Sequence, residues 1–143
     1  MNHIQFADAR ESHSNCLMCG NRNPLSFGLT FQQHNDLSVS SRFKGNITLQ
    51  GYSGILHGGV LSSLLDTAMA NCLLHLNIKA MTGELKVRFL QPVKYDSILS
   101  IKAWLTASLP PLYHLKSEIR VNDTLVCRGR ARFMEKDENE LPL

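Results

Sequence analysis

The amino-acid sequence predicts an α+β fold in which a long antiparallel sheet curls around one buried helix. Two observations carry this prediction. Residues 57–76 show a helical repeat of apolar residues, whereas the other patterned segments alternate apolar and polar residues, as strands do. Four alternating segments follow the helix in succession with short connections. We therefore expect one sheet with one face covered by that helix.

The helix is expected from His57 to Leu76. Its apolar residues recur at helical spacing and form a wide arc, which indicates a helix that is mostly buried: Val60, Leu61, Leu64, Leu65, Ala68, Met69, Cys72, Leu73 and Leu76. A narrower polar stripe contains Asp66. A carboxylate on such a helix requires an explanation, because removing it from water without partners is costly.

Strands are expected on both sides of this helix. Residues 25–43 read as two antiparallel strands with a break near Asn35-Asp36. The strands after the helix are expected at Thr82–Leu90, Leu99–Ala107, Leu112–Val121 and Thr124–Met134. Together these elements predict a domain of residues 25–135. A polar lead-in, 1–24, precedes it, and we expect the charged tail, 136–143, to be frayed.

The composition is typical of one soluble globular domain. The chain has 143 residues, of which 43% are hydrophobic and 19% charged, and its formal charge is +3. So mild a charge, without a recognisable nucleic-acid-binding module, argues against a nucleic-acid partner. The N-terminus shows no signal-like apolar run, and polar residues interrupt the most apolar stretch, Val60–Leu76. We expect no membrane span and a cytoplasmic location.

In that compartment the four cysteines are expected to be reduced thiols. Cys16 and Cys19 form one CxxC pair, and His13 is the only further ligand nearby. A structural zinc site needs four ligands, and no second pair follows at the usual spacing, so we expect no metal and no other cofactor. Cys72 and Cys127 fall in apolar helix and strand patterns, which favours buried thiols.

The start of the helix is the segment that points to chemistry. Gly58 and Gly59 stand where a loop becomes the helix, so a ligand can approach the backbone closely. The first N–H groups of a helix lack intrahelical partners and lie at its positive end, which suits a carbonyl oxygen that gains negative charge. Asp66 lies about 12 Å further along the helix axis. In a symmetric dimer, the partner's helix can bring its own Asp66 to that carbonyl.

A resemblance to a known family is carried by two adjoining segments, GILHGGVLSSLLDTAMA at 54–70 and TGELKVRFLQPV at 82–93. They are similar to the PaaI-type hotdog thioesterases of the 4-hydroxybenzoyl-CoA thioesterase superfamily, and the similarity runs from about Leu25 to Phe133. The lead-in sequence CLMCGNRNPLSFGL at 16–29 also resembles one bacterial branch. The resemblance implies a hotdog fold, with the sheet wrapped around one long central helix, and hydrolysis of acyl-CoA to a carboxylic acid and CoA.

The resemblance also implies roles for single residues. Gly58 matches the glycine whose amide polarises the thioester carbonyl, and Asp66 matches the acid that acts as general base on water or as nucleophile. Thr82 matches a Ser/Thr that orients water. His57 matches the histidine near the carbonyl, with a purely structural histidine as the alternative. Gln50 is the candidate for an upstream amide that contacts the carbonyl or the base.

Substrate and partners follow from the same resemblance. The CoA phosphates call for basic residues, and the candidates lie in the polar rows of the strands: Lys86, Arg88, Arg128, Arg130 and Arg132. The alternative for each is the solvent face of the sheet. We expect a homodimer, or a tetramer of two dimers, because the family's sites form between subunits. A non-catalytic acyl-CoA-binding domain and an acyl-thioester dehydratase or hydratase are the alternative functions, and the acyl group is left open.

Overall fold

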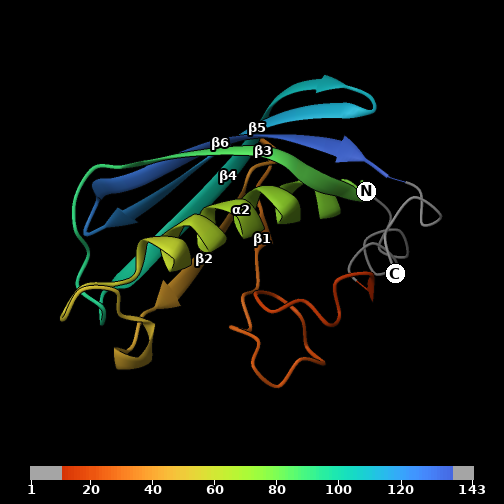
Figure 1. Ribbon diagram of the computed structural model, residues 1–143. Helices are drawn as coiled ribbons and strands as arrows, with labels where there is room; N and C mark the ends of the chain where they lie inside the picture. The colour runs from red at the N-terminus through yellow and green to blue at the C-terminus, as the bar shows by residue number, and fades with distance from the viewer. Residues whose placement is uncertain (1–10, 137–143) are drawn as a thin grey trace.

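The structure, a computed structural model, describes residues 11–136. Six strands form one antiparallel sheet in the order β1-β2-β4-β5-β6-β3. The sheet curls around the long helix α2 (Figure 1). The elements are β1 (Gln32–Gln33), β2 (Val39–Lys44), the 3-10 turn η1 (Ile47–Leu49), α2 (Gly58–Leu74), β3 (Ala80–Phe89), β4 (Ile98–Leu109), β5 (Leu112–Val121) and β6 (Thr124–Glu135). The predicted fold class is confirmed.

Helix α2 is buried along most of its length, as its wide apolar arc predicts. Leu64, Leu65, Ala68, Met69 and Cys72 are wholly inaccessible to solvent. The helix ends at Leu74, two residues before the predicted end. Asn77 adopts a left-handed conformation with φ +58°, and the N–H of Ile78 returns to the carbonyl of Leu73 at 2.9 Å. A left-handed residue of this kind terminates many helices, so an apolar Leu76 does not extend this one.

Strands β4, β5 and β6 alternate largely as the sequence predicts, whereas the first of the two strands expected in 25–43 is reduced to the two residues of β1. In β5, Tyr113, Leu115, Ser117 and Ile119 are buried beneath the helix, while the residues between them face outward. β5 has the predicted bounds, and β4 and β6 differ from theirs by at most two residues. The core thus lies between α2 and one face of the sheet, and the opposite face of the sheet is polar.

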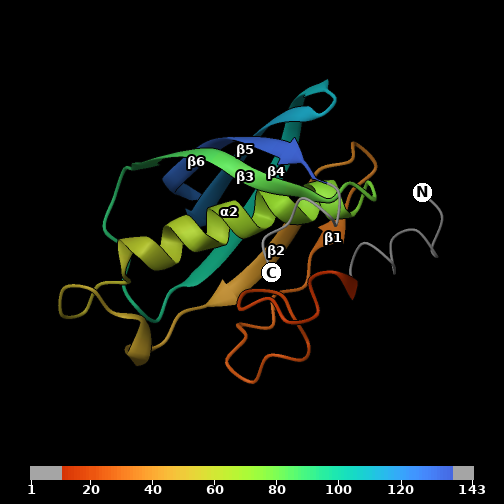
Figure 2. The same ribbon diagram turned by 45° about the vertical axis from the view of Figure 1, so that its right-hand side comes forward.

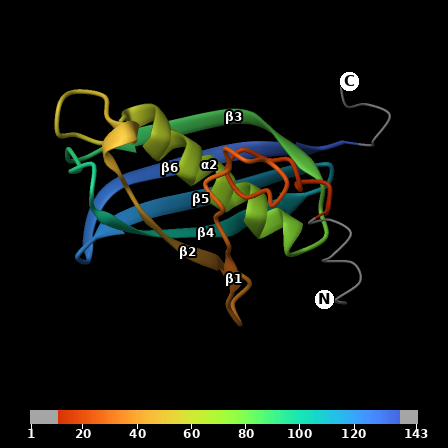
Figure 3. The same cartoon turned by 90° about the horizontal axis from the view of Figure 1, so that it is seen from below.

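The lead-in lies on the side of α2 that faces away from the sheet (Figures 2 and 3). Met18 and Cys19 of this segment are only 8% and 1% exposed and belong to the same core as the helix. The predicted boundary between residues 24 and 25 therefore does not separate two structural units. The predicted tail lies outside the described residues apart from Lys136, and the N-terminus considered for a targeting signal is described only from residue 11.

Strand β3 forms one edge of the sheet. It pairs with β6 along its length and, among the residues that the structure describes, its other edge carries no strand. Met81 and Phe89 of this ten-residue strand are 44% and 51% exposed. A long edge strand with exposed apolar residues is a template for pairing with another chain.

Within 11–136, no helix is both long and apolar enough to cross a lipid bilayer.

Candidate active site

His57 shapes the start of α2. Its Nδ1 accepts a hydrogen bond of 2.7 Å from the N–H of Gly59, and its carbonyl accepts one of 3.0 Å from Val60. A Cβ on Gly59 would lie 2.9 Å from that Nδ1, so the cap requires glycine there. The ring thus caps the helix through one nitrogen, and Nε2 is left to carry the proton of the neutral ring.

The backbone N–H of Gly58 is not bound by the His57 cap. As the first helical residue, Gly58 has no intrahelical acceptor for its N–H, and in the part of the chain that is described no other group accepts from it. A cleft of about 670 Å³ opens beside it. The cleft is lined mostly by apolar residues: Gly51, Tyr52, Ile55, Leu56, His57, Gly58, Leu61, Phe89, Leu90, Gln91, Pro92 and Val93. An apolar cleft with one backbone donor at its wall can hold an acyl group and its carbonyl.

Asp66 lies half-buried in the middle of α2 and accepts a hydrogen bond of 2.6 Å on Oδ1 from the hydroxyl of Thr82. Burial raises the pKa of the Asp66 carboxyl above its ordinary value of 3.8, while the Thr82 hydroxyl and the charge of His13 oppose the rise. Within 11–136, Oδ2 has no hydrogen-bond partner. This oxygen is available to a water molecule or a substrate.

A β-bulge turns Thr82 toward Asp66. The pairing of β3 with β6 shifts by one residue between Thr82 and Glu84, so Thr82 lies opposite the buried Phe133 while Glu84 lies opposite the exposed Arg132. Strict alternation would place Thr82 and Glu84 on the same, outward face. The extra residue reverses the side on which Thr82 points, as bulges beside functional sites often do.

The two parts of the site do not meet within one chain. Asp66 follows Gly58 by two turns of the same helix, which separates them by about 12 Å along its axis. Asp66 is absent from the lining of the cleft beside Gly58. The structure therefore brings together Gly58 with His57, and Asp66 with Thr82, as two separate pairs.

Gln50 is held by the backbone of its own loop. Its Nε2 donates to the carbonyl of Ile47 at 2.8 Å, and its Oε1 accepts from the N–H of Gly54 at 2.6 Å. These contacts fix the turn that leads into the helix. The side chain reaches neither Asp66 nor the cleft lining, so the structure gives Gln50 a supporting place instead of the expected contact with the carbonyl.

The predicted basic residues lie on the outer face of the sheet, away from α2. Lys86, Arg88, Arg128 and Arg130 line a second hollow of about 810 Å³, together with Trp104. Arg132 is not in that lining and pairs with Glu84. None of these basic side chains lines the cleft beside Gly58.

Three residues near the two pairs were not predicted as site residues. Tyr52, 88% exposed, and Leu90 line the cleft, and the apolar run that continues past the end of β3 is the signal that points to Leu90. His13 lies close enough to Asp66 for its charge to lower the pKa of that carboxyl. Nothing in the sequence pattern brings the lead-in to the middle of the helix.

Comparison with known proteins finds the same fold and a partial match to one family model. A family model described as "Thioesterase superfamily" matches residues 53–108, which include α2 and β3. The acyl-coenzyme A thioesterase THEM4 of Bos taurus is 28% identical over 109 residues, which are 75% of this chain and 45% of that protein. The protein of the same name from Mus musculus is 29% identical over 65 residues, or 46% and 28% of the two chains. The chain thus spans less than half the length of the curated relatives it matches.

Solved structures share the fold over most of the chain. The PaaI protein from the phenylacetic acid degradation operon of E. coli superposes with a TM-score of 0.78 at 19% identity, over 92% of this chain and 96% of that one. A conserved protein from Pseudomonas aeruginosa gives a TM-score of 0.69 at 25% identity, over 77% and 90%. A hypothetical thioesterase protein from Streptococcus pneumoniae, solved with coenzyme A, gives 0.70 at 20% identity, over 76% and 85%. The chain therefore has the hotdog fold of these structures, and the part of it that holds α2 and β3 is similar to the thioesterase superfamily.

Proposed function

We propose that this protein hydrolyses acyl-CoA thioesters to a carboxylic acid and CoA. The observation that carries the proposal is the N–H of Gly58, which points from the positive end of α2 beside an apolar cleft. The names of the curated relatives and the coenzyme A in the pneumococcal structure support this substrate class. The basic outer face remains our candidate for contacts with the CoA phosphates, through Lys86, Arg88, Arg128 and Arg130.

The chemistry assigns one task to each pair. The thioester carbonyl accepts a hydrogen bond from the Gly58 N–H, which stabilises the negative charge that develops on the oxygen. Asp66 acts in its ionised form, with Thr82 donating to Oδ1. Oδ2 then either removes a proton from the attacking water or attacks the carbonyl itself. In the first route water adds to the acyl carbon, the C–S bond breaks, and the thiolate of CoA leaves and takes up a proton. In the second route the C–S bond breaks as an anhydride forms between Asp66 and the acyl group, and water then hydrolyses that anhydride to the carboxylic acid and free Asp66.

The complete site is proposed to form between two chains, because Gly58 and Asp66 of one helix are about 12 Å apart along its axis. The open edge of β3, with Met81 and Phe89 exposed, favours pairing with the same strand of a second copy. Such pairing sets two α2 helices side by side, and each Asp66 can then approach the Gly58 of the other chain. A tetramer of two such dimers is compatible with this arrangement, and we expect the assembly to be cytoplasmic.

The experiment that tests the proposed function is the release of free CoA thiol by the parent protein and by Asp66→Asn. Aryl, short, medium and long acyl-CoA substrates are compared, which also identifies the acyl group. We expect Asp66→Asn to lower kcat by about 10²–10⁴-fold, the contribution typical of a positioned base. Asp123→Asn is the matched control, because Asp123 lies in an exposed turn with φ +64°, a conformation that asparagine adopts readily.

The outcomes separate the alternatives. Near-parental turnover by Asp66→Asn would remove Asp66 from the mechanism. A parent protein that binds acyl-CoA without releasing thiol from any substrate would be a binding domain. Interconversion of unsaturated and hydroxylated acyl-CoA without thiol release would identify a hydratase or dehydratase.

A further inference from the structure

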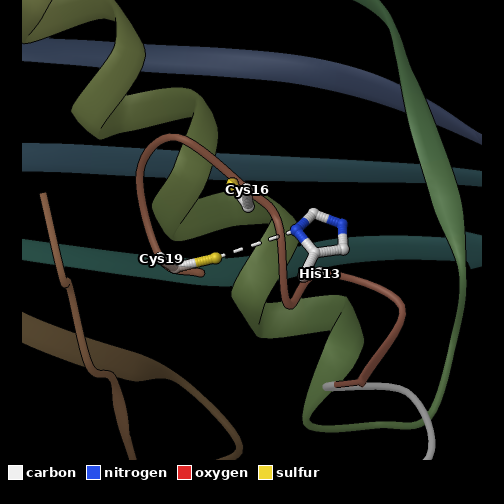
Figure 4. Close-up of side chains that lie close together, drawn as sticks. All are labelled: His13, Cys16 and Cys19. Atoms are coloured by element: carbon white, nitrogen blue, oxygen red, sulfur yellow. Dashed lines mark hydrogen bonds between the residues drawn. The ribbon is translucent and has the colours of Figure 1, made fainter. Parts of the chain in front are cut away.

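The lead-in brings three metal-binding side chains together against α2. His13, Cys16 and Cys19 come from one short stretch of chain, and their donor atoms all lie within 4.8 Å of one another. In Figure 4 the Cys19 sulfur points at the His13 ring, and the two atoms that face each other, Sγ and Nδ1, are 3.7 Å apart. Within the described range, no fourth His, Cys, Asp or Glu joins the group.

The spacing of these atoms is close to that of a tetrahedral zinc site. With Zn–S bonds of about 2.3 Å and Zn–N bonds of about 2.0–2.1 Å, tetrahedral geometry separates sulfur from nitrogen by about 3.6 Å and two sulfurs by about 3.8 Å. The Cys19–His13 distance already agrees with this value. The remaining donor distances need to close by about 1 Å at most.

The backbone of the turn is arranged around the sulfur of Cys16. The N–H of Met18 donates to Cys16 Sγ at 3.4 Å, and the N–H of Gly20 donates to the Cys16 carbonyl at 2.9 Å. A Cβ on Gly20 would lie 2.4 Å from the Ser14 carbonyl oxygen and 2.5 Å from the Cys16 nitrogen, so no other residue fits this turn. A backbone donor to a sulfur orients it, which is the part that outer-shell groups play in metal sites.

The position of the turn also suits a metal centre. Cys19 is 1% exposed and Met18 8% exposed, so the inner side of the turn is closed by the hydrophobic core. Cys16 and His13 are partly exposed, which leaves a path by which an ion can enter. Two thiolates and one imidazole are soft donors that select zinc over magnesium or calcium.

We propose that His13, Cys16 and Cys19 bind one Zn²⁺ ion, with a solvent molecule in the fourth position, and that this centre fastens the lead-in to α2. Binding converts the two thiols to thiolates and releases two protons, so the dithiolate centre carries no net charge. The proposed hydrolysis assigns no step to the ion: its donor, acid and orienting hydroxyl are Gly58, Asp66 and Thr82, and His13 acts on Asp66 only through its charge. The two proposals can therefore fail independently.

The test begins with the metal content of the purified, reduced protein, followed by titration with Co²⁺, a spectroscopic substitute for zinc. We expect about one metal ion per chain, thiolate-to-cobalt charge-transfer absorption, and displacement of cobalt by Zn²⁺. Cys16→Ser, Cys19→Ser and His13→Gln remove ligands. Each should weaken binding by more than about 100-fold, since loss of an outer-shell partner alone costs 10–100-fold. Cys72→Ala and His114→Gln, which alter a thiol and an imidazole elsewhere, should bind as the parent does.

A second measurement does not depend on the folding of any variant. Alkylation of the native parent protein with and without Zn²⁺, followed by mass mapping, should show that zinc protects the partly exposed Cys16; the buried Cys19 reacts slowly in either case. Absence of cobalt charge-transfer absorption in the reduced parent protein would overturn the proposal. So would absorption that persists when both cysteines are replaced, or a Cys16–Cys19 disulfide whose reduction restores no metal binding.

Discussion

Replacement of Gly58 by proline is a precise test of the proposed carbonyl contact, because it deletes one N–H and little else. Position 58 is the first residue of α2, where proline is favoured since its nitrogen needs no intrahelical acceptor. The preceding residue, His57, has φ −61° and ψ 132°, close to the polyproline-II conformation, and not the helical conformation that a following proline disfavours. A Cβ at 58 meets only the ring of Phe89, at an ordinary contact distance of 3.5 Å.

The expected effect is large on catalysis and small on stability. Loss of one donor to a developing oxyanion costs about 2.7–4 kcal/mol, so kcat should fall by about 10²–10³-fold. The free energy of unfolding should change by no more than about 1 kcal/mol, because the proline is compatible with the backbone. Gly58→Ala keeps the N–H and adds the same Cβ. It should keep kcat within about tenfold of the parent, which separates the donor from the steric change.

The assay is thiol release at saturating acyl-CoA, with thermal unfolding as the check on the fold. Mixing Gly58→Pro with Asp66→Asn after subunit exchange adds a test of the shared site. Random pairing makes half of the dimers hybrids, and each hybrid has one intact site of two, so about a quarter of the parental activity should return. Parental turnover by Gly58→Pro would refute the role of the N–H, and a mixture no more active than its components would refute the site between chains.

Three further predictions concern Thr82, Asp66 and Gly20. Because the Thr82 hydroxyl lowers the pKa of Asp66, Thr82→Val should move the acid limb of the kcat/KM profile to higher pH, with Thr124→Val, at an exposed strand start, as the control. The folded-state pKa of Asp66 is raised above 3.8, so its protonated form stabilises the fold below pH 3.8, and this stabilisation is lost as the pH rises through the folded-state pKa. At pH 7, Asp66→Asn should therefore unfold at a temperature equal to or above that of the parent. A clear decrease in the unfolding temperature would contradict the argument from burial. Gly20→Ala should make the lead-in more sensitive to proteolysis, because its Cβ would overlap backbone atoms of Ser14 and Cys16. Gly28→Ala is the control: its Cβ has open space, so it introduces only backbone strain and should be cleaved more slowly.

The sequence predicts the helix and the strands because burial on one face imposes a period on the residues. It misplaces features that depend on a single backbone irregularity. Alternation along β3 assigns Thr82 to the outer face with Glu84 and Lys86, whereas the bulge near Gly83 returns it to the helix side. Thr82 is predicted as a site residue from the family resemblance alone, which identifies the position but does not show the bulge that turns it toward the helix.

The local sequence pattern also does not predict which segments distant in the chain come together in the fold. The lead-in reads as polar, and only Met18 and Cys19 enter the core, too few to form a period. The basic rows were predicted correctly as alternating residues of β3 and β6, but alternation does not say which face of the sheet meets a cleft. From the sequence, His13, Cys16 and Cys19 are one ligand short of the four that a structural zinc site needs. The structure shows that the turn supplies geometry and backbone donors that a count of ligands omits.

The distance between Gly58 and Asp66 on a single rigid helix has a consequence for kinetics. If the acid and the donor of each catalytic unit belong to different molecules, competence follows mass action, and turnover per chain depends on the total protein concentration. Below the dissociation constant of the dimer the rate would rise with the square of that concentration. Substrate bound across the two helices would in turn hold the pair together, so acyl-CoA itself would favour assembly of the machinery that consumes it.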